Sequence, residues 1–166
     1  MIVLGLDPGT AATGYGVVSR EPCGSLSLIE CGVIRTTARD RLPVRLRELH
    51  EELVRLIARH HPDVLAIEDV FYARNVRTTL VLGHARGVLL LAAEEAGLEI
   101  HEYPPATIKK TIVGAGGASK VQVQFMVARL LRLKHAPQPS DAADGVAAAL
   151  TYLMTARLPQ LTEPQR

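Results

Sequence analysis

Four carboxylates lie at positions where a folded chain could bring them together. Asp7 directly follows the apolar run 2–6, and Glu68 follows the apolar run 64–67. Asp141 and Asp144 are three residues apart at the start of an alanine-rich segment, so a helix there would place both on one face, one turn apart. Two like charges ~4 Å apart repel by about 4 kcal/mol at an effective dielectric near 20, and a divalent cation removes that cost. We therefore expect these four acids to form a metal site.

The donor atoms indicate which metal such a site would take. Carboxylate oxygens without Cys or His partners favour Mg²⁺ over zinc, and Mn²⁺ should be able to substitute. Four acids suffice for two ions, an arrangement that activates a water and stabilises the leaving oxygen in phosphodiester hydrolysis. If the four acids bind metal, 13 of the 17 acids remain against 19 Lys and Arg, and this excess of positive charge suits a polyanion.

Two of these acids also have a simpler explanation. Asp7 precedes Pro8 and Gly9, so it could lie in an ordinary hairpin turn. Asp141 in the first turn of a helix could serve only the helix dipole. Asp144 is harder to explain in this way, because it faces the same direction at the start of an otherwise apolar helix.

The elements around the acids predict how the chain brings them together. Apolar runs at 2–7, 17–18 and 26–36 indicate three strands in an antiparallel meander. Helical spacing of leucines after Pro43 predicts an amphipathic helix that ends near His61, and it should deliver 64–68 as a strand parallel to the first. The later segments are expected to be helices at 75–96, 104–112, 119–133 and 141–156, with a strand at 98–103.

Two of these later helices have recognisable starts. Ser119 and Gln122 form a capping-box pattern, and Ser140 is expected to cap the last helix. The whole pattern predicts an α/β domain of ribonuclease H type. Its mixed five-stranded sheet should have three antiparallel strands followed by parallel strands, flanked by helices.

The length of 166 residues, 48% of them apolar, favours one domain, which we place at residues 1–157. The polar tail 158–166 is expected to be disordered. No uninterrupted apolar run approaches ~20 residues, and the N-terminus starts directly on a strand pattern without a charged leader. We therefore expect neither membrane insertion nor secretion, and a cytoplasmic protein.

Several longer motifs occur in a recognisable order and spacing. They read GLDPGTAATGYGVV, AIEDVFYARN, GHARG, TIKKTIVGAGGASKVQVQFMV and SDAADGVAAALTY. Together they resemble the RuvC family of Holliday-junction resolvases, from Ile2 to about Ala156. The resemblance implies a homodimeric, Mg²⁺-dependent endonuclease that cuts two strands of a four-way DNA junction symmetrically during homologous recombination and DNA repair. It also implies the RuvA/RuvB branch-migration complex as a partner.

The resemblance also implies roles for single residues. Asp7, Glu68, Asp141 and Asp144 match the metal-binding acids of the family. Lys109 matches a lysine that contacts phosphates, Lys120 a lysine near the active site, and Phe71 the aromatic that probes the junction. Asp69 departs from the family pattern, in which a neutral residue such as Gln is expected; it could orient a metal-bound water or point away.

Other residues near these motifs could contact DNA. Phe71 and Tyr72 follow Glu68 closely, so an aromatic there could stack on an unpaired base, although a lone Phe can equally be a core residue. Arg74, Arg77 and Arg86 could contact phosphates or be ordinary surface charges. The helix at 75–96 also carries two glycines four residues apart, which would let another helix approach, either in a dimer or against the sheet: Gly83 and Gly87.

Two other functional classes remain open at this stage. The Asp-Pro-Gly-Thr turn at residues 7–10 also resembles the phosphate loop of actin-like ATPases and sugar kinases, but those proteins need two such domains around a nucleotide. A non-catalytic junction-binding scaffold is the second alternative. Four intact acids argue against it, and a cleavage assay with Mg²⁺ or EDTA would decide.

Overall fold

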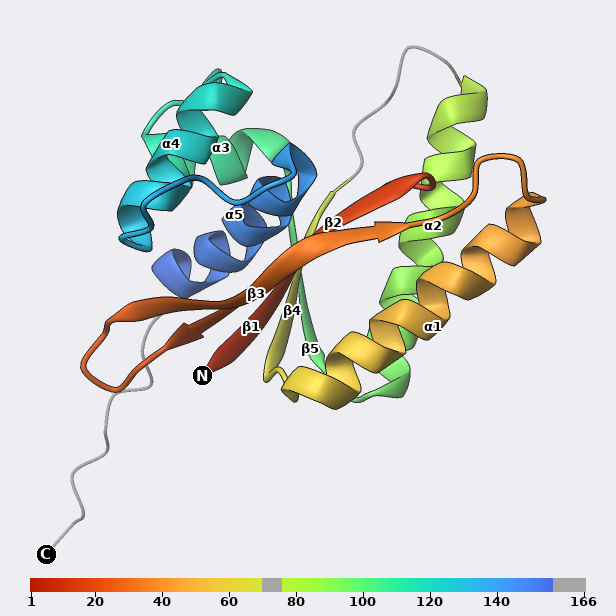
Figure 1. The fold of residues 1–166 in the computed structure, drawn as a ribbon, viewed down its shortest axis with the longest axis horizontal. Coiled ribbons are helices and arrows are strands. Elements are labelled where there is room, and N and C mark those ends of the chain that lie inside the picture. Colours follow the sequence, from red (N-terminus) through yellow and green to blue (C-terminus); the bar gives the residue numbers. More distant parts are fainter. Residues whose placement is uncertain (70–75, 157–166) are drawn as a thin grey trace, which may run out of the picture.

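A five-stranded mixed sheet forms the centre of the computed structural model, which describes residues 1–69 and 76–156 (Figure 1). The strand order is β3-β2-β1-β4-β5. Strands β1 to β3 pair antiparallel, whereas β4 and β5 run parallel to β1. The predicted fold class is therefore confirmed. The strands span Ile2–Asp7, Ala12–Arg20, Leu26–Arg35, Val64–Glu68 and Glu99–Tyr103.

Helices cover both faces of this sheet (Figure 1). Helices α1 (Leu42–His60) and α2 (Val76–Glu95) pack on one face. The other face carries α3 (Pro105–Val113), α4 (Lys120–Leu130) and α5 (Ser140–Thr155). The prediction for the tail 158–166 lies outside the described residues.

The alternation of side chains along β1 and β4 explains why the core has two parts. Val3 and Ala66 belong to the cluster under α3, α4 and α5, whereas Leu4 and Ile67 belong to the cluster under α1 and α2. Consecutive strand residues point to opposite faces, so a strand that is buried on both sides needs apolar residues in succession. The same alternation decides on which face the residue that ends each strand will lie.

The starts of the last two helices agree only partly with the sequence prediction. At α4 the predicted capping box is confirmed, because the Ser119 side chain accepts from the Gln122 backbone N–H while the Gln122 side chain accepts from the Ser119 N–H. The predicted cap of α5 is wrong by one residue. Pro139 holds the N-cap position with extended backbone, and Ser140 is already helical without a side-chain capping bond.

Glycines allow α5 to lie directly on β1 and β2. A Cβ added at Gly5 would be 2.1 Å from the Gly145 carbonyl oxygen, and one added at Gly14 would be 1.9 Å from the Asp141 carbonyl oxygen. Real Cβ atoms do not approach so closely, so the helix could not keep this position if either glycine carried a side chain. The close contact sets the first turn of α5 beside the end of β1.

Helix α2 is the one helix among the described residues that is long and apolar enough to cross a membrane by length and composition. Core helices of soluble proteins satisfy the same criterion. One side of α2 is part of the core, where it buries Ala85, Leu89, Ala92 and Ala93. Its other side exposes Leu80 and Leu91.

Candidate active site

Asp7 and Glu68 end two neighbouring parallel strands at the same edge of the sheet. Leu6 of β1 is paired with Ile67 of β4, so the two acids follow at the same level. Because Leu6 and Ile67 belong to the core under α1 and α2, the next residue in each strand points to the opposite face, toward α5. The alternation thus delivers both carboxylates to one side of the sheet.

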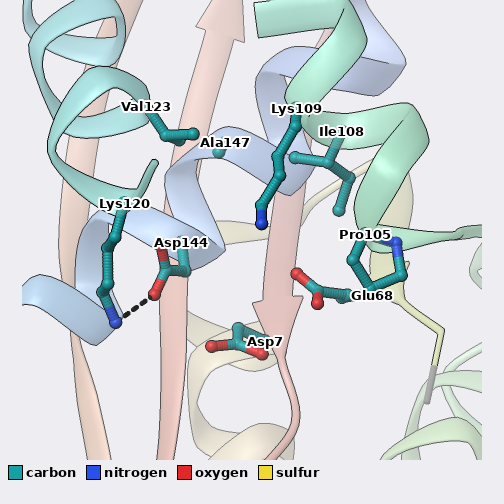
Figure 2. A pocket seen from close by; sticks show the side chains of 9 residues that line it. All are labelled: Asp7, Glu68, Pro105, Ile108, Lys109, Lys120, Val123, Asp144 and Ala147. Atoms are coloured by element: carbon teal, nitrogen blue, oxygen red, sulfur yellow. Dashed lines mark ion pairs between the residues drawn. The ribbon is translucent and has the colours of Figure 1, made fainter. Parts of the chain in front are cut away.

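Helix α5 adds Asp144 to these two acids. The three carboxylates line one pocket of about 210 Å³, together with Lys109 of α3 and Lys120 of α4 (Figure 2). An apolar wall completes the pocket and is formed by Pro105, Ile108, Val123 and Ala147. Three of the four predicted metal ligands therefore come together, from β1, β4 and α5.

Lys120 lies between the two aspartates of α5. Its Nζ is 2.7 Å from Asp144 Oδ2 and 3.2 Å from Asp141 Oδ1. Asp141 does not line the pocket and is connected to it through this lysine. Within residues 1–69 and 76–156, no three side chains of ligand type are arranged around a common metal position. An ammonium group supplies the positive charge beside the aspartates.

Lys120 does not fully offset the repulsion and burial of the three carboxylates, because the pKa of each remains raised. Burial, and then the neighbouring Asp144 carboxylate, raise the pKa of Asp7 from 3.8 to about 7. Burial, and then Asp7, raise the pKa of Glu68 from 4.5 to about 7. The pKa of Asp144 is also raised, mainly by burial, although Lys120 opposes the rise. The raised pKa values show that the charged forms of these carboxylates are disfavoured in the pocket. A further cation bound there would stabilise the charged forms.

Lys109 is the second cation of the pocket. It is half-buried on α3 and points toward Glu68, whereas Lys110 beside it is exposed (Figure 2). Its positive charge opposes the rise in the pKa of Glu68. The orientation of α3 follows from burial of Ile108 and Ile112 against the core, which turns Lys109 toward the pocket.

Of the remaining predicted DNA contacts, the structure describes Arg77 alone. Arg77 is exposed in the first turn of α2. Phe71, Tyr72 and Arg74 lie outside the described residues.

A charged cluster behind Glu68 was not foreseen from the sequence. Arg86 of α2 pairs with Asp69, 3.3 Å away, and with Glu102 of β5. The arginine is therefore paired with two acids, which disfavours the phosphate contact considered for it, and Asp69 has a partner on the side away from the pocket. The three residues come from separate elements, so no local spacing could have indicated the cluster.

The chain also matches known proteins over nearly its whole length. The family described as crossover junction endodeoxyribonuclease RuvC matches residues 3–152. The crossover junction endodeoxyribonuclease RuvC of Syntrophomonas wolfei is 43% identical over 163 residues, which cover 98% of this chain and 94% of the relative.

Two solved structures of Thermus thermophilus RuvC are similar in fold and sequence. One has a TM-score of 0.85 at 35% identity, and the other, in complex with a Holliday junction substrate, has a TM-score of 0.84 at 32% identity. Each comparison covers 93% of this chain and 94% of the solved chain. The chain belongs to the RuvC family of crossover junction endodeoxyribonucleases.

Proposed function

We propose that this endonuclease resolves Holliday junctions by metal-dependent hydrolysis of one phosphodiester bond in each of two strands, placed symmetrically, during recombination and repair. The observation that carries the proposal is the pocket in which Asp7, Glu68 and Asp144 converge with raised pKa values. Carboxylates that repel one another in a partly buried pocket gain most from a bound cation.

The chemistry of the donors fits Mg²⁺, with Mn²⁺ as a substitute, because all of them are hard oxygen ligands. We propose that Asp7, Glu68, Asp141 and Asp144 hold two ions. When bound, such ions supply an activated water and stabilise the leaving oxygen. Lys120 must leave the aspartates for them to act as ligands, and its side chain, 49% exposed, is free to turn toward solvent.

The two lysines have a separate part in this proposal. The hydrogen bond to Asp144 is the main cause that raises the pKa of Lys120, so this side chain is protonated at neutral pH and cannot act as a base. It can instead donate a hydrogen bond to a phosphate oxygen of the substrate. Lys109, on the opposite wall, can hold a second phosphate. Further DNA contacts proposed from sequence position are Phe71, Tyr72, Arg74 and Arg77.

A homodimer is the assembly that we propose. The outer side of α2 exposes Leu80 by 60% and Leu91 by 53%, and Cβ positions at Gly83 and Gly87 have no atom within 4 Å among the described residues. Together with Leu46 of α1 these residues line an apolar groove. A second copy related by a twofold axis would cover this surface and supply a second pocket for the second strand of a symmetric junction.

The resemblance to the family also supports two broader proposals. We place the enzyme in the cytoplasm, and we expect it to meet the RuvA/RuvB branch-migration complex at the junction.

Cleavage of a labelled synthetic four-way junction tests the function directly. Wild-type protein should cut two opposite strands with Mg²⁺, should not cut with EDTA, and should leave matched duplex and flap substrates intact. Replacing Asp7, Glu68, Asp141 or Asp144 by the corresponding amide should abolish cleavage and preserve junction binding, because ligation fails while the basic surface is unchanged. An exposed loop acid provides the control, Asp40→Asn, which should cut normally. Cleavage within tenfold of wild type would remove the substituted acid from the site.

Junction binding tests the lysine contacts. Lys109→Ala should weaken binding and lower the slope of log Kd against log salt by about 1, because one phosphate contact and its counterion are lost. Lys110→Ala, the exposed neighbour, is the matched control. An unchanged slope in Lys109→Ala would mean that Lys109 does not contact DNA.

A further inference from the structure

Arg86 lies behind the strand that ends in Glu68. It is on α2, its side chain is only 19% exposed, and its guanidinium group pairs with Asp69 and Glu102. Asp69 directly follows β4 and Glu102 belongs to β5. One side chain therefore joins a helix to the ends of two neighbouring strands.

Asp69 and Glu68 are successive residues on opposite faces of the sheet. The Glu68 side chain lines the pocket on the α5 face, whereas the Asp69 side chain is held by Arg86 on the α2 face. The backbone N–H of Asp69 donates to the Tyr103 carbonyl at 2.8 Å, so the pairing of β4 with β5 continues past Glu68. Because adjacent strand residues move together, a contact that fixes Asp69 also fixes the direction of Glu68.

The charges of the cluster strengthen this effect. Arg86 neutralises two carboxylates, and without it Asp69 and Glu102 would repel each other at the ends of adjacent strands. Both acids lie against the same nitrogen, Nη2, of a guanidinium group that is planar and permanently charged. A lysine would keep the charge but would hold the two acids less rigidly.

We propose that Arg86 is a positioning residue for Glu68. By holding Asp69 and Glu102 from the α2 side, it fixes the end of β4 so that the Glu68 carboxylate points into the pocket. This inference rests on the proposed function, in which Glu68 is a metal ligand. Arg86 should therefore affect metal affinity and the rate of cleavage through Glu68, and it should not affect the affinity for the junction.

Arg86→Met removes the charge and keeps most of the side-chain volume. At saturating junction and Mg²⁺, the single-turnover cleavage rate should fall about 10- to 100-fold, the scale expected when a reacting group is displaced by about 1 Å. Junction Kd, measured in EDTA, should stay within twofold. Binding of Mn²⁺ without DNA, followed by the electron paramagnetic resonance signal of the free ion, should weaken several-fold. Arg86→Lys should recover part of both losses.

The matched control is Arg47→Met, which removes an exposed arginine from an ion pair on α1 and should change none of these values. Asp69→Asn gives a second route if Arg86→Met does not fold. It should lower the cleavage rate and Mn²⁺ affinity with junction Kd unchanged, because the contact behind Glu68 is weakened.

Three results would overturn the inference. One is an unchanged rate and unchanged Mn²⁺ affinity in folded Arg86→Met while the wild type cleaves. Another is a loss of junction affinity with a lower salt slope and a normal saturated rate, since that would make Arg86 a phosphate contact. The third is normal behaviour of Asp69→Asn where Arg86→Met is unfolded. Failure of the wild type to cleave would instead refute the proposed function, and Mn²⁺ binding would still report on the role of Arg86.

Discussion

Replacing Asp7 by Asn should stabilise the metal-free protein at alkaline pH. Asn has nearly the same shape as Asp and carries no charge, so the substitution removes an ionised group from a partly buried position beside Asp144. Replacing Asp7, which we propose as a metal ligand, should therefore raise the free energy of unfolding of the metal-free protein.

The magnitude follows from the pKa of the carboxyl group. Burial, with Asp144 as the second cause, raises the pKa of Asp7 from 3.8 to about 7. One pH unit corresponds to 1.36 kcal/mol, so ionising Asp7 costs about 4 kcal/mol more in the folded protein than in the unfolded chain. Relaxation around the charge and the response of Lys120 reduce this value, and we expect a gain of about 2–4 kcal/mol, or about 5–10 °C in Tm, at pH 8.

The dependence on pH gives the prediction its sign. An acid whose pKa is raised in the folded state binds its proton more tightly there than in the unfolded chain. The loss of folding stability caused by ionising Asp7 is therefore absent below pH 3.8, grows between about pH 4 and 7, and is complete above pH 7. Metal-free wild type should lose stability as pH rises through this window, and Glu68 should contribute in the same direction. The gain from Asp7→Asn should be about 2 kcal/mol larger at pH 8 than at pH 5.

Urea unfolding in EDTA at pH 5 and pH 8 measures these differences. Asp40→Asn, at an exposed loop acid, should change stability little at either pH. Adding Mg²⁺ at pH 8 should stabilise the wild type much more than Asp7→Asn, because ligand binding favours the folded state in proportion to affinity. Equal gains at both pH values, or a loss at pH 8, would refute the electrostatic account of the pocket.

Two further substitutions test how the site is built and assembled. Gly14→Ala should shift the first turn of α5, because the added Cβ would meet the Asp141 carbonyl oxygen. It should reduce cleavage and lower the free energy of unfolding by about 1–3 kcal/mol. Gly117→Ala is the control, because the space around Gly117 is open. Full activity in Gly14→Ala would mean that the close contact does not place the acids. Leu80→Glu should yield a monomer in sedimentation with Tm nearly unchanged, whereas Val54→Glu on α1 should not. A Leu80→Glu dimer would exclude this side of α2 from the interface.

The positions of Asp7 and Glu68 could be predicted because each depends on local pattern and one topological rule. An apolar run that ends in a carboxylate marks a strand end, and a helical crossover makes the second strand parallel to the first. Parallel neighbours end at the same edge, so the two acids had to lie close together, as the pairing of Leu6 with Ile67 shows. The capping box at Ser119 was predictable for the same reason, since its partners are three residues apart.

The relation of Lys120 to the aspartates could not be predicted in that way. Lys120 begins α4 and Asp141 lies in the first turn of α5, and the 20 residues between them include a loop with no periodic pattern. Their contact depends on how closely α5 lies on the sheet, which is set by glycines in β1, β2 and α5 itself. Nothing in the sequence around Asp141 indicates that Lys120 would pair with it and with Asp144.

The cluster of Arg86, Asp69 and Glu102 shows why an unexpected residue can matter to a predicted site. From the sequence, Asp69 departs from the family pattern and could either orient a metal-bound water or point away. Alternation in a strand places successive residues on opposite faces, so a charge next to a catalytic acid lies behind the site and needs its own partner there. Arg86 provides that partner, and in the role that we propose for it this contact fixes the end of β4 from the face opposite the pocket.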